Sequence, residues 1–71
     1  MNPLRFDDDS LATVKANMAC AQRLLREHNV PGEYSSQLLA NMLDLLDLDE
    51  MDEEDIEKWV GEGCREMGLA W

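Results

Sequence analysis

Apolar residues recur at alternating spacings of three and four through the first part of the chain. They stand at Leu11, Val14, Met18, Ala21 and Leu25. This alternation places them on one face of an α-helix. Past that run, Asn29 tolerates the left-handed conformation, and Pro31-Gly32 prevents the helix from continuing. The pattern predicts an amphipathic helix over residues 11–28, and the rest of the chain must pack against its apolar face.

A second helix is predicted over residues 36–47. The hydroxyl group of Ser35 or Ser36 can cap its first free N–H groups. The apolar residues of this segment cover most of the helix circumference and are Leu38, Leu39, Met42, Leu43, Leu45 and Leu46. A helix this broadly apolar must be covered on more than one side. We therefore expect it to be the central element of the fold or half of a dimer interface.

A third helix is predicted over residues 53–67. Asp52 is a favourable N-cap residue, and the three acids at 53–55 fall in the first turn, where the helix dipole favours negative charge. Gly61 and Gly63 each cost about 1 kcal/mol relative to alanine inside a helix. We expect the helix to fray or bend there unless Gly63 permits a close contact with another helix.

The fold class follows from these segments and from what is missing between them. No segment alternates apolar and polar residues with a period of two, so no strand is expected. A chain of 71 residues makes one domain with a small core and marginal stability. The predicted fold is all-α, a small three-helix bundle of a helical hairpin plus a third helix, in one domain over residues 1–71. A homodimer is left open.

The location of the protein is predicted from two absences in the sequence. No signal-peptide pattern opens the chain, and no apolar run approaches the roughly 18 residues that a membrane helix needs. Cys20 and Cys64 lie far apart, without the spacing of a disulfide framework or zinc site. We expect both to be small buried apolar residues in a reducing cytoplasm, with no role for a membrane.

The triplet Asp9-Ser10-Leu11 and the residues after it raise one specific alternative. They resemble the phosphopantetheine attachment site of acyl carrier proteins, which are likewise small, acidic and helical. The resemblance covers about ten residues and implies that Ser10 carries the prosthetic arm. In a carrier protein a full helix and a long loop precede the modified serine, whereas nine residues precede Ser10. We therefore expect Ser10 to cap the first helix through its hydroxyl group.

No catalytic, metal or cofactor site is predicted. His28 is the single histidine and stands in the last turn of the first helix, where its charge favours the carbonyl end. The acidic run from Asp44 lacks the glycine and the ligand register of an EF-hand calcium loop. No nucleophile, base and orienting group can be assembled from the remaining residues, so the protein is not expected to be an enzyme.

The net charge of −10 is concentrated in the second half of the chain. Residues 35–71 contain eleven acidic and two basic residues. Such a segment repels nucleic acid and attracts basic protein surfaces. Carboxylates three or four residues apart on a helix lie about 5–6 Å from one another, so a row of them can imitate the phosphates that a basic groove receives. A charged face that only keeps the protein soluble remains the alternative.

These features predict a small inhibitor or modulator, of the sort that phages and mobile elements encode, which docks an acidic face on a basic nucleic-acid-binding protein. The alternative is a regulatory adaptor or homodimeric subunit that binds through an apolar helix face. In the first case acids would steer association and exposed apolar side chains would supply short-range affinity. The predicted partner-binding residues are Asp44, Asp47, Asp49, Glu50, Asp52, Glu53, Glu54, Asp55, Glu57, Trp59, Trp71 and Leu38.

Overall fold

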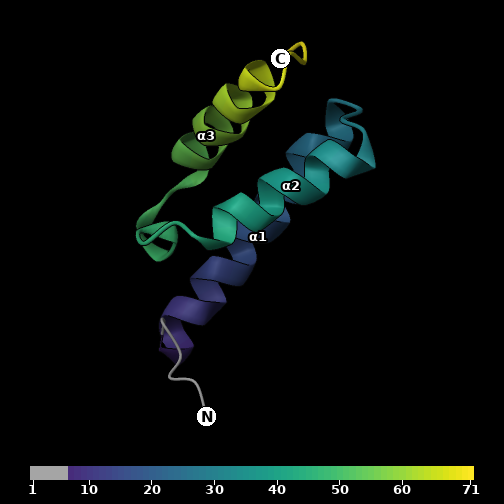
Figure 1. Ribbon diagram of the computed structural model, residues 1–71. Coiled ribbons are helices and arrows are strands. Elements are labelled where there is room, and N and C mark those ends of the chain that lie inside the picture. The colour runs from purple at the N-terminus through teal and green to yellow at the C-terminus, as the bar shows by residue number, and fades with distance from the viewer. Residues whose placement is uncertain (1–6) are drawn as a thin grey trace.

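The computed structural model describes residues 7–71 and contains three α-helices (Figure 1). These are α1 (Asp8–Glu27), α2 (Gly32–Leu43) and α3 (Glu53–Glu66), with a short 3₁₀ turn, η1 (Leu48–Glu50), between the last two. No strand occurs within 7–71. The prediction of a small all-α fold with three helices is confirmed, although the first six residues of the predicted domain lie outside the described residues.

Helix α1 begins one turn earlier than predicted, and Ser10 is not its cap. The carboxylate of Asp7 is the cap and accepts a hydrogen bond from the Ser10 backbone N–H at 2.8 Å. Hydrogen bonds from the backbone and side chain of Ser10 hold the pKa of Asp7 below its ordinary value. Asp8 and Asp9 then occupy the first turn. Since an aspartate caps at least as well as a serine, the earlier acid takes this role.

The end of α1 follows the prediction closely. Asn29 adopts the left-handed conformation with a φ of 55°. The backbone N–H of Val30 donates to the carbonyl oxygen of Leu25 at 3.0 Å, which satisfies one of the free carbonyl groups of the last turn. The chain then reverses, and α2 runs back along α1 (Figure 1).

Helix α2 spans Gly32–Leu43 and so differs from the predicted range of 36–47. Its N-cap residue is Pro31, with no side-chain cap, and the hydroxyl group of Ser35 instead donates to the carbonyl oxygen of Val30. The carbonyl oxygen of Pro31 accepts from the backbone N–H groups of Tyr34 and Ser35 at 3.1 and 3.0 Å, so the first turn forms without a capping hydroxyl. The helix ends early because the chain turns after Leu43 and brings Leu48 into the core.

The central element is α1, which corrects the prediction that the second helix has this role. Helix α1 packs against α2, η1 and α3, whereas α2 and α3 meet over a small area. Only Leu38 and Met42 of α2 are buried. The physical reason is length and pattern: α1 has 20 residues and a continuous apolar face, whereas α2 is too short to contact every other element.

The core draws on all three helices and on the 3₁₀ turn. The buried apolar residues are Val14, Ala21, Leu25, Leu38, Met42, Leu48, Ile56, Val60 and Cys64. Both cysteines are free; Cys64 is buried, whereas Cys20 is half-buried. Burial raises the pKa of the Cys64 thiol. Cys64 therefore acts as a small apolar core residue, as predicted, and Cys20 does so only in part.

The two glycines of α3 are packing positions, and the helix continues through both of them. A Cβ at Gly61 would lie 2.6 Å from Nε1 of Trp71, and one at Gly63 would overlap Cδ2 of Leu38. The segment after α3 reverses at Gly68, which has a φ of 82°. It places the Trp71 ring on the His28 ring, with the two ring centroids 3.7 Å apart.

Substitution of Gly63 by alanine tests the close contact between α2 and α3. Because Leu38 is 2% exposed, it has little room to move away from an added methyl group. Gly63→Ala should lower the free energy of unfolding by about 1–3 kcal/mol, as overpacking does in other cores. Gly32→Ala is the control, since a Cβ there meets no atom within 4 Å. Urea unfolding followed by circular dichroism measures both; equal stability of the two variants would contradict the packing role.

Candidate partner-binding surface

Residues 44–57, here named the acidic segment, run from the end of α2 through η1 into the first turns of α3. They include nine acidic residues and no basic residue. The side chain of Leu48 is fully buried in the middle of this segment. A loop of this charge would be expected to extend into solvent, but the burial of Leu48 ties it to the core.

Asn17 of α1 holds the same segment by hydrogen bonds. Its Nδ2 donates to the carbonyl oxygen of Leu48 at 2.7 Å and to that of Met51 at 3.0 Å. Asn17 is the one buried polar residue among residues 7–71, with 9% of its surface exposed. A side-chain amide carries two N–H donors, and here Nδ2 fixes the backbone at the first residue of η1 and at the residue that follows η1.

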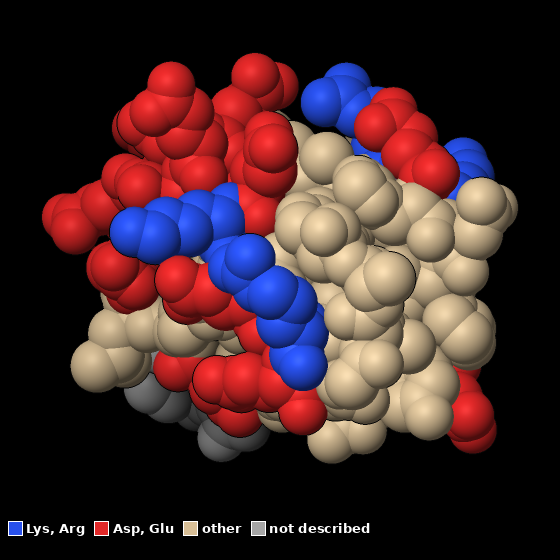
Figure 2. All heavy atoms as spheres, turned by 90° about the horizontal axis from the view of Figure 1, so that it is seen from above, with Lys and Arg blue, Asp and Glu red and all other residues tan. Residues whose placement is uncertain are grey.

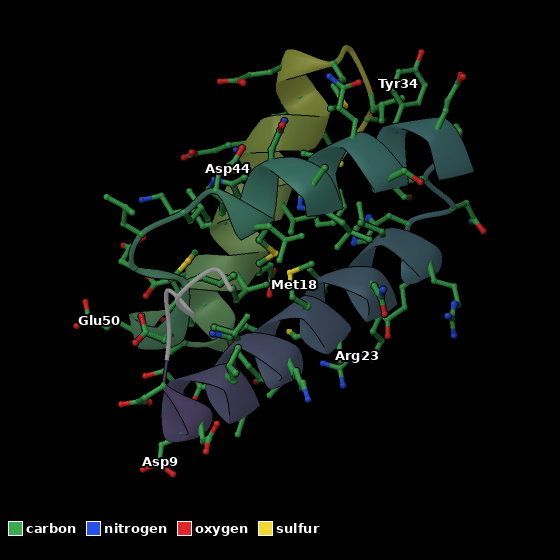
Figure 3. All side chains as sticks on the ribbon, turned by 60° about the horizontal axis from the view of Figure 1, so that its bottom comes forward. Asp9, Met18, Arg23, Tyr34, Asp44 and Glu50 are labelled. Carbon is green, nitrogen blue, oxygen red and sulfur yellow. The ribbon has the colours of Figure 1, made fainter. Side chains whose placement is uncertain are left out.

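The sequence analysis did not identify Asn17, although the sequence contains a signal. The buried positions of α1 are Val14, Asn17, Ala21 and Leu25, so a polar residue stands on the apolar stripe. Met18, which was placed on that stripe, is half-buried and packs against the core (Figure 3). A buried asparagine must find hydrogen-bond partners. The backbone groups inside a helix are already paired, so its position on the stripe indicates that a non-helical segment packs there.

The carboxylates of Asp52 and Asp55 start α3. The Asp55 backbone N–H donates to Oδ1 of Asp52 at 2.9 Å, and the Asp52 backbone N–H donates to Oδ2 of Asp55 at 3.4 Å. This reciprocal pair is a capping box. The predicted cap at Asp52 is confirmed, and these two acids of the acidic segment have a structural role in addition to their charge.

The other acids of the segment are presented to solvent. Asp49 is half-buried, whereas the exposed ones are Asp44, Asp47, Glu50, Glu53, Glu54 and Glu57. Side chains of Asp44 and Glu50 point outward in Figure 3. In the view of Figure 2, acidic side chains gather on one side, Lys and Arg side chains lie among and beside them, and a broad uncharged area follows. The predicted acidic surface is therefore formed by the connection between α2 and α3 and by the first turns of α3.

One acid of the segment has an ion-pair partner within residues 7–71. Nη2 of Arg23 lies 3.8 Å from Oε1 of Glu53, and Nε of Arg23 lies 3.9 Å from Oε1 of Glu27. All three side chains are more than half exposed. Exposed ion pairs at this distance contribute little to stability, so Glu53 remains available to a stronger partner.

The apolar part of the predicted surface needs correction. Leu38 is buried against Gly63 and is not available to a partner. Trp59 and Trp71 are half-buried, and Trp71 is also covered by its stack on His28. The exposed large apolar residues are instead Leu43, at 50%, and Leu46, at 81%. They were assigned to the covered face of a longer helix, and the early end of α2 turns them outward.

Leu43 and Leu46 alternate with two exposed acids, Asp44 and Asp47. The run therefore presents apolar and negatively charged side chains in turn at the start of the acidic segment. Aliphatic contact with a carboxylate rim suits an amphipathic, basic protein surface. This combination is the surface that the structure offers in place of the predicted one around Leu38.

Three further observations bear on other kinds of site. Within residues 7–71, no three His, Cys, Asp or Glu side chains are arranged so that they could hold a metal ion. None of the described helices has the length and apolar character needed to cross a membrane. Ser10 is half-buried in the first turn of α1.

Comparison of the chain with protein-family models, curated proteins and solved structures finds no match.

The role of Asn17 can be tested by two substitutions. Asn17→Ala removes both hydrogen bonds and leaves the two carbonyl groups without a donor, which should lower the free energy of unfolding by about 1–3 kcal/mol. Asn17→Asp should be more destabilising at pH 7, because the introduced carboxylate faces two carbonyl oxygens. Urea unfolding measures stability, and hydrogen exchange of the amides at 47–51 measures local opening.

The two variants should respond differently to pH. Repulsion from the carbonyl oxygens raises the pKa of the introduced carboxyl group in the folded state. The extra loss of stability in Asn17→Asp is therefore present above that pKa and shrinks as pH falls through it, because the protonated group can donate one hydrogen bond. Asn41→Ala, at an exposed position of α2, is the control. A pH-independent difference between the two Asn17 variants would contradict this account.

Proposed function

We propose that this protein acts by binding another protein, and that the acidic segment docks on a basic surface of the kind that binds nucleic acid. It would then inhibit or modulate that protein by occupying its nucleic-acid site. The observation that carries the proposal is the attachment of the acidic segment to the core through buried Leu48 and the Asn17 hydrogen bonds. A segment that served solubility alone would not need a fixed backbone.

A fixed backbone matters for binding because it reduces the entropy lost on association. A mobile acidic loop would have to be ordered by its partner, which weakens the affinity. Here the outward carboxylates of Asp44, Asp47, Glu50, Glu54 and Glu57 start from a defined main chain. Their charge would also accelerate the encounter with a basic partner.

The short-range part of the affinity is assigned to Leu43 and Leu46. Charge steers association, but apolar contact at the centre of an interface supplies most of its free energy. These two side chains are the exposed large apolar residues among 7–71 and adjoin Asp44 and Asp47. They replace Leu38 in the proposed interface.

The exposure of the same two leucine side chains also favours a second function. In this alternative the protein is a homodimeric subunit or an adaptor that binds its partner through an apolar surface. Leu46 is 81% exposed and Leu43 is 50% exposed. Two copies could bury these residues against one another without any use of the acids. This alternative predicts a different dependence on salt, because apolar contact is not screened.

The dependence on the acidic segment is tested by two variants of equal charge. Glu50→Gln with Glu54→Gln removes two charges from the segment, and Glu27→Gln with Glu33→Gln removes two from the region where α1 meets α2. Each pair changes the net charge from −10 to −8. Figure 1 shows the two regions on opposite sides of the molecule. If each exposed charge pair contributes about 0.7 kcal/mol, within the usual range, the loss of two should weaken binding of a basic partner by roughly tenfold.

Partners for this measurement come from capture on the immobilised protein from a nuclease-treated bacterial lysate, at low salt and at about 0.5 M salt, where the screening length is a few ångströms. The proposal expects a nucleic-acid-binding protein that is retained at low salt, is released at high salt and is displaced by DNA or RNA. Equal weakening by both variants, or a partner that nucleic acid does not displace, would contradict it.

Leu46→Ser separates the two functions. Since Leu46 is 81% exposed, the substitution should change the free energy of unfolding by less than about 0.5 kcal/mol. Partner affinity at low salt should fall, because the apolar contact that Leu46 supplies is lost. Sedimentation equilibrium then decides the alternative. A mass of twice 8.1 kDa that returns to the monomer value in Leu46→Ser would establish the apolar homodimer, and a monomer in both proteins would exclude it.

A further inference from the structure

A groove separates α2 from α3 on a part of the surface that the proposed function does not use. Its volume is about 330 Å³. The α2 side is formed by Gln37, Leu38 and Asn41, and the α3 side by Trp59, Glu62, Gly63, Glu66 and Met67. The groove exists because α2 and α3 meet over a small area, with the close contact of Leu38 and Gly63 as its floor.

The α3 wall has a regular pattern. Trp59, Gly63 and Met67 are spaced by four residues and so follow one face of the helix. The glycine carries no side chain, so Leu38 packs against it and forms the floor between the two larger side chains, both of which are half-buried. An aliphatic chain of a few carbons could lie over this floor, between the indole and the thioether.

The charge of the groove is entirely negative. Glu62 and Glu66 line it, both are exposed, and no Lys or Arg is among its lining residues. Gln37 and Asn41 supply amide oxygens on the opposite wall. The groove therefore combines apolar contact, carboxylates and neutral hydrogen-bond acceptors.

The groove also adjoins the acidic segment. Trp59 and Glu62 line a second hollow of about 270 Å³ together with Asp47, Met51, Asp55 and Lys58. Trp59 thus stands between the two depressions. A partner docked on the acidic segment would have its surface next to the mouth of the groove.

We propose that the groove between α2 and α3 binds one arginine side chain of a protein partner. The methylene groups would lie between Trp59 and Met67, and the guanidinium group would bind the carboxylates of Glu62 and Glu66. Arginine fits this set better than lysine, because its planar group stacks on an indole and donates five hydrogen bonds to several acceptors at once. The identity of the partner rests on the proposed function, but the chemistry of the groove does not.

The test uses a seven-residue peptide with a single central arginine between alanine and serine residues, titrated into the whole protein. NMR follows the Trp59 indole N–H and the Met67 methyl group. We expect saturable shifts at both, weaker binding of the lysine peptide, and no saturable shift with the citrulline peptide, which keeps the shape and lacks the charge. Saturable binding of the citrulline peptide, or no shift at Trp59 and Met67 with the arginine peptide, would overturn the proposal.

Two variants of equal net charge distinguish binding of the peptide in the groove from its general attraction to an acidic protein. Glu62→Gln with Glu66→Gln should lower the affinity for the arginine peptide roughly five- to tenfold, because two exposed charge pairs are lost. Glu50→Gln with Glu54→Gln should leave its affinity within about twofold, because Glu50 and Glu54 do not line the groove. Equal weakening by both variants would overturn the site.

The outcomes also distinguish this site from the proposed function. Arginine binding in the groove with no salt-dependent partner would leave the groove established and the acidic-segment proposal wrong. A partner that depends on Glu50 and Glu54, with no peptide bound in the groove, would overturn the present inference alone.

Discussion

The hydrogen bonds from the Asn17 amide to the carbonyl groups of Leu48 and Met51 fix the connection between α2 and α3 on α1. They join the middle of the longest helix to a connection whose acidic side chains repel one another. An amide buried without partners would cost free energy comparable to a lost hydrogen bond. The connection therefore has one favourable path across α1. The position of the first turn of α3, and hence of its acids, depends on that path.

A second constraint comes from the glycines of α3. Gly63 admits Leu38 and Gly61 admits Trp71, so two large apolar side chains fill positions where a helix would usually present its own. This arrangement brings α2 and the last residues onto α3, in addition to the core contacts of Ile56, Val60 and Cys64. The contact between α2 and α3 is confined to a small area that includes Leu38 and Gly63, and the groove beside Trp59 and Met67 remains next to it.

Charge and order are coupled in this molecule. Two acids of the acidic segment close a capping box, and one faces Arg23 at a long distance. Of the others, Asp49 is half-buried and the rest are exposed on a backbone that α1 holds. Repulsion among them lowers stability, and the core contact of Leu48 offsets it. In the proposed function, a basic partner would relieve the same repulsion on docking.

The sequence by itself determined the features that depend on neighbours within about one helical turn. These include three helices, the left-handed residue Asn29, the cap at Asp52 and the concentration of acids after residue 43. Only the tertiary structure decided that α1 is central, that Leu38 is buried while Leu43 and Leu46 are exposed, and that the acidic segment is fixed. Those outcomes depend on contacts between residues far apart in the chain, such as the Asn17 hydrogen bond to a carbonyl group 31 positions away. Periodicity shows which face of a helix is apolar, but burial depends on whether another element reaches that face.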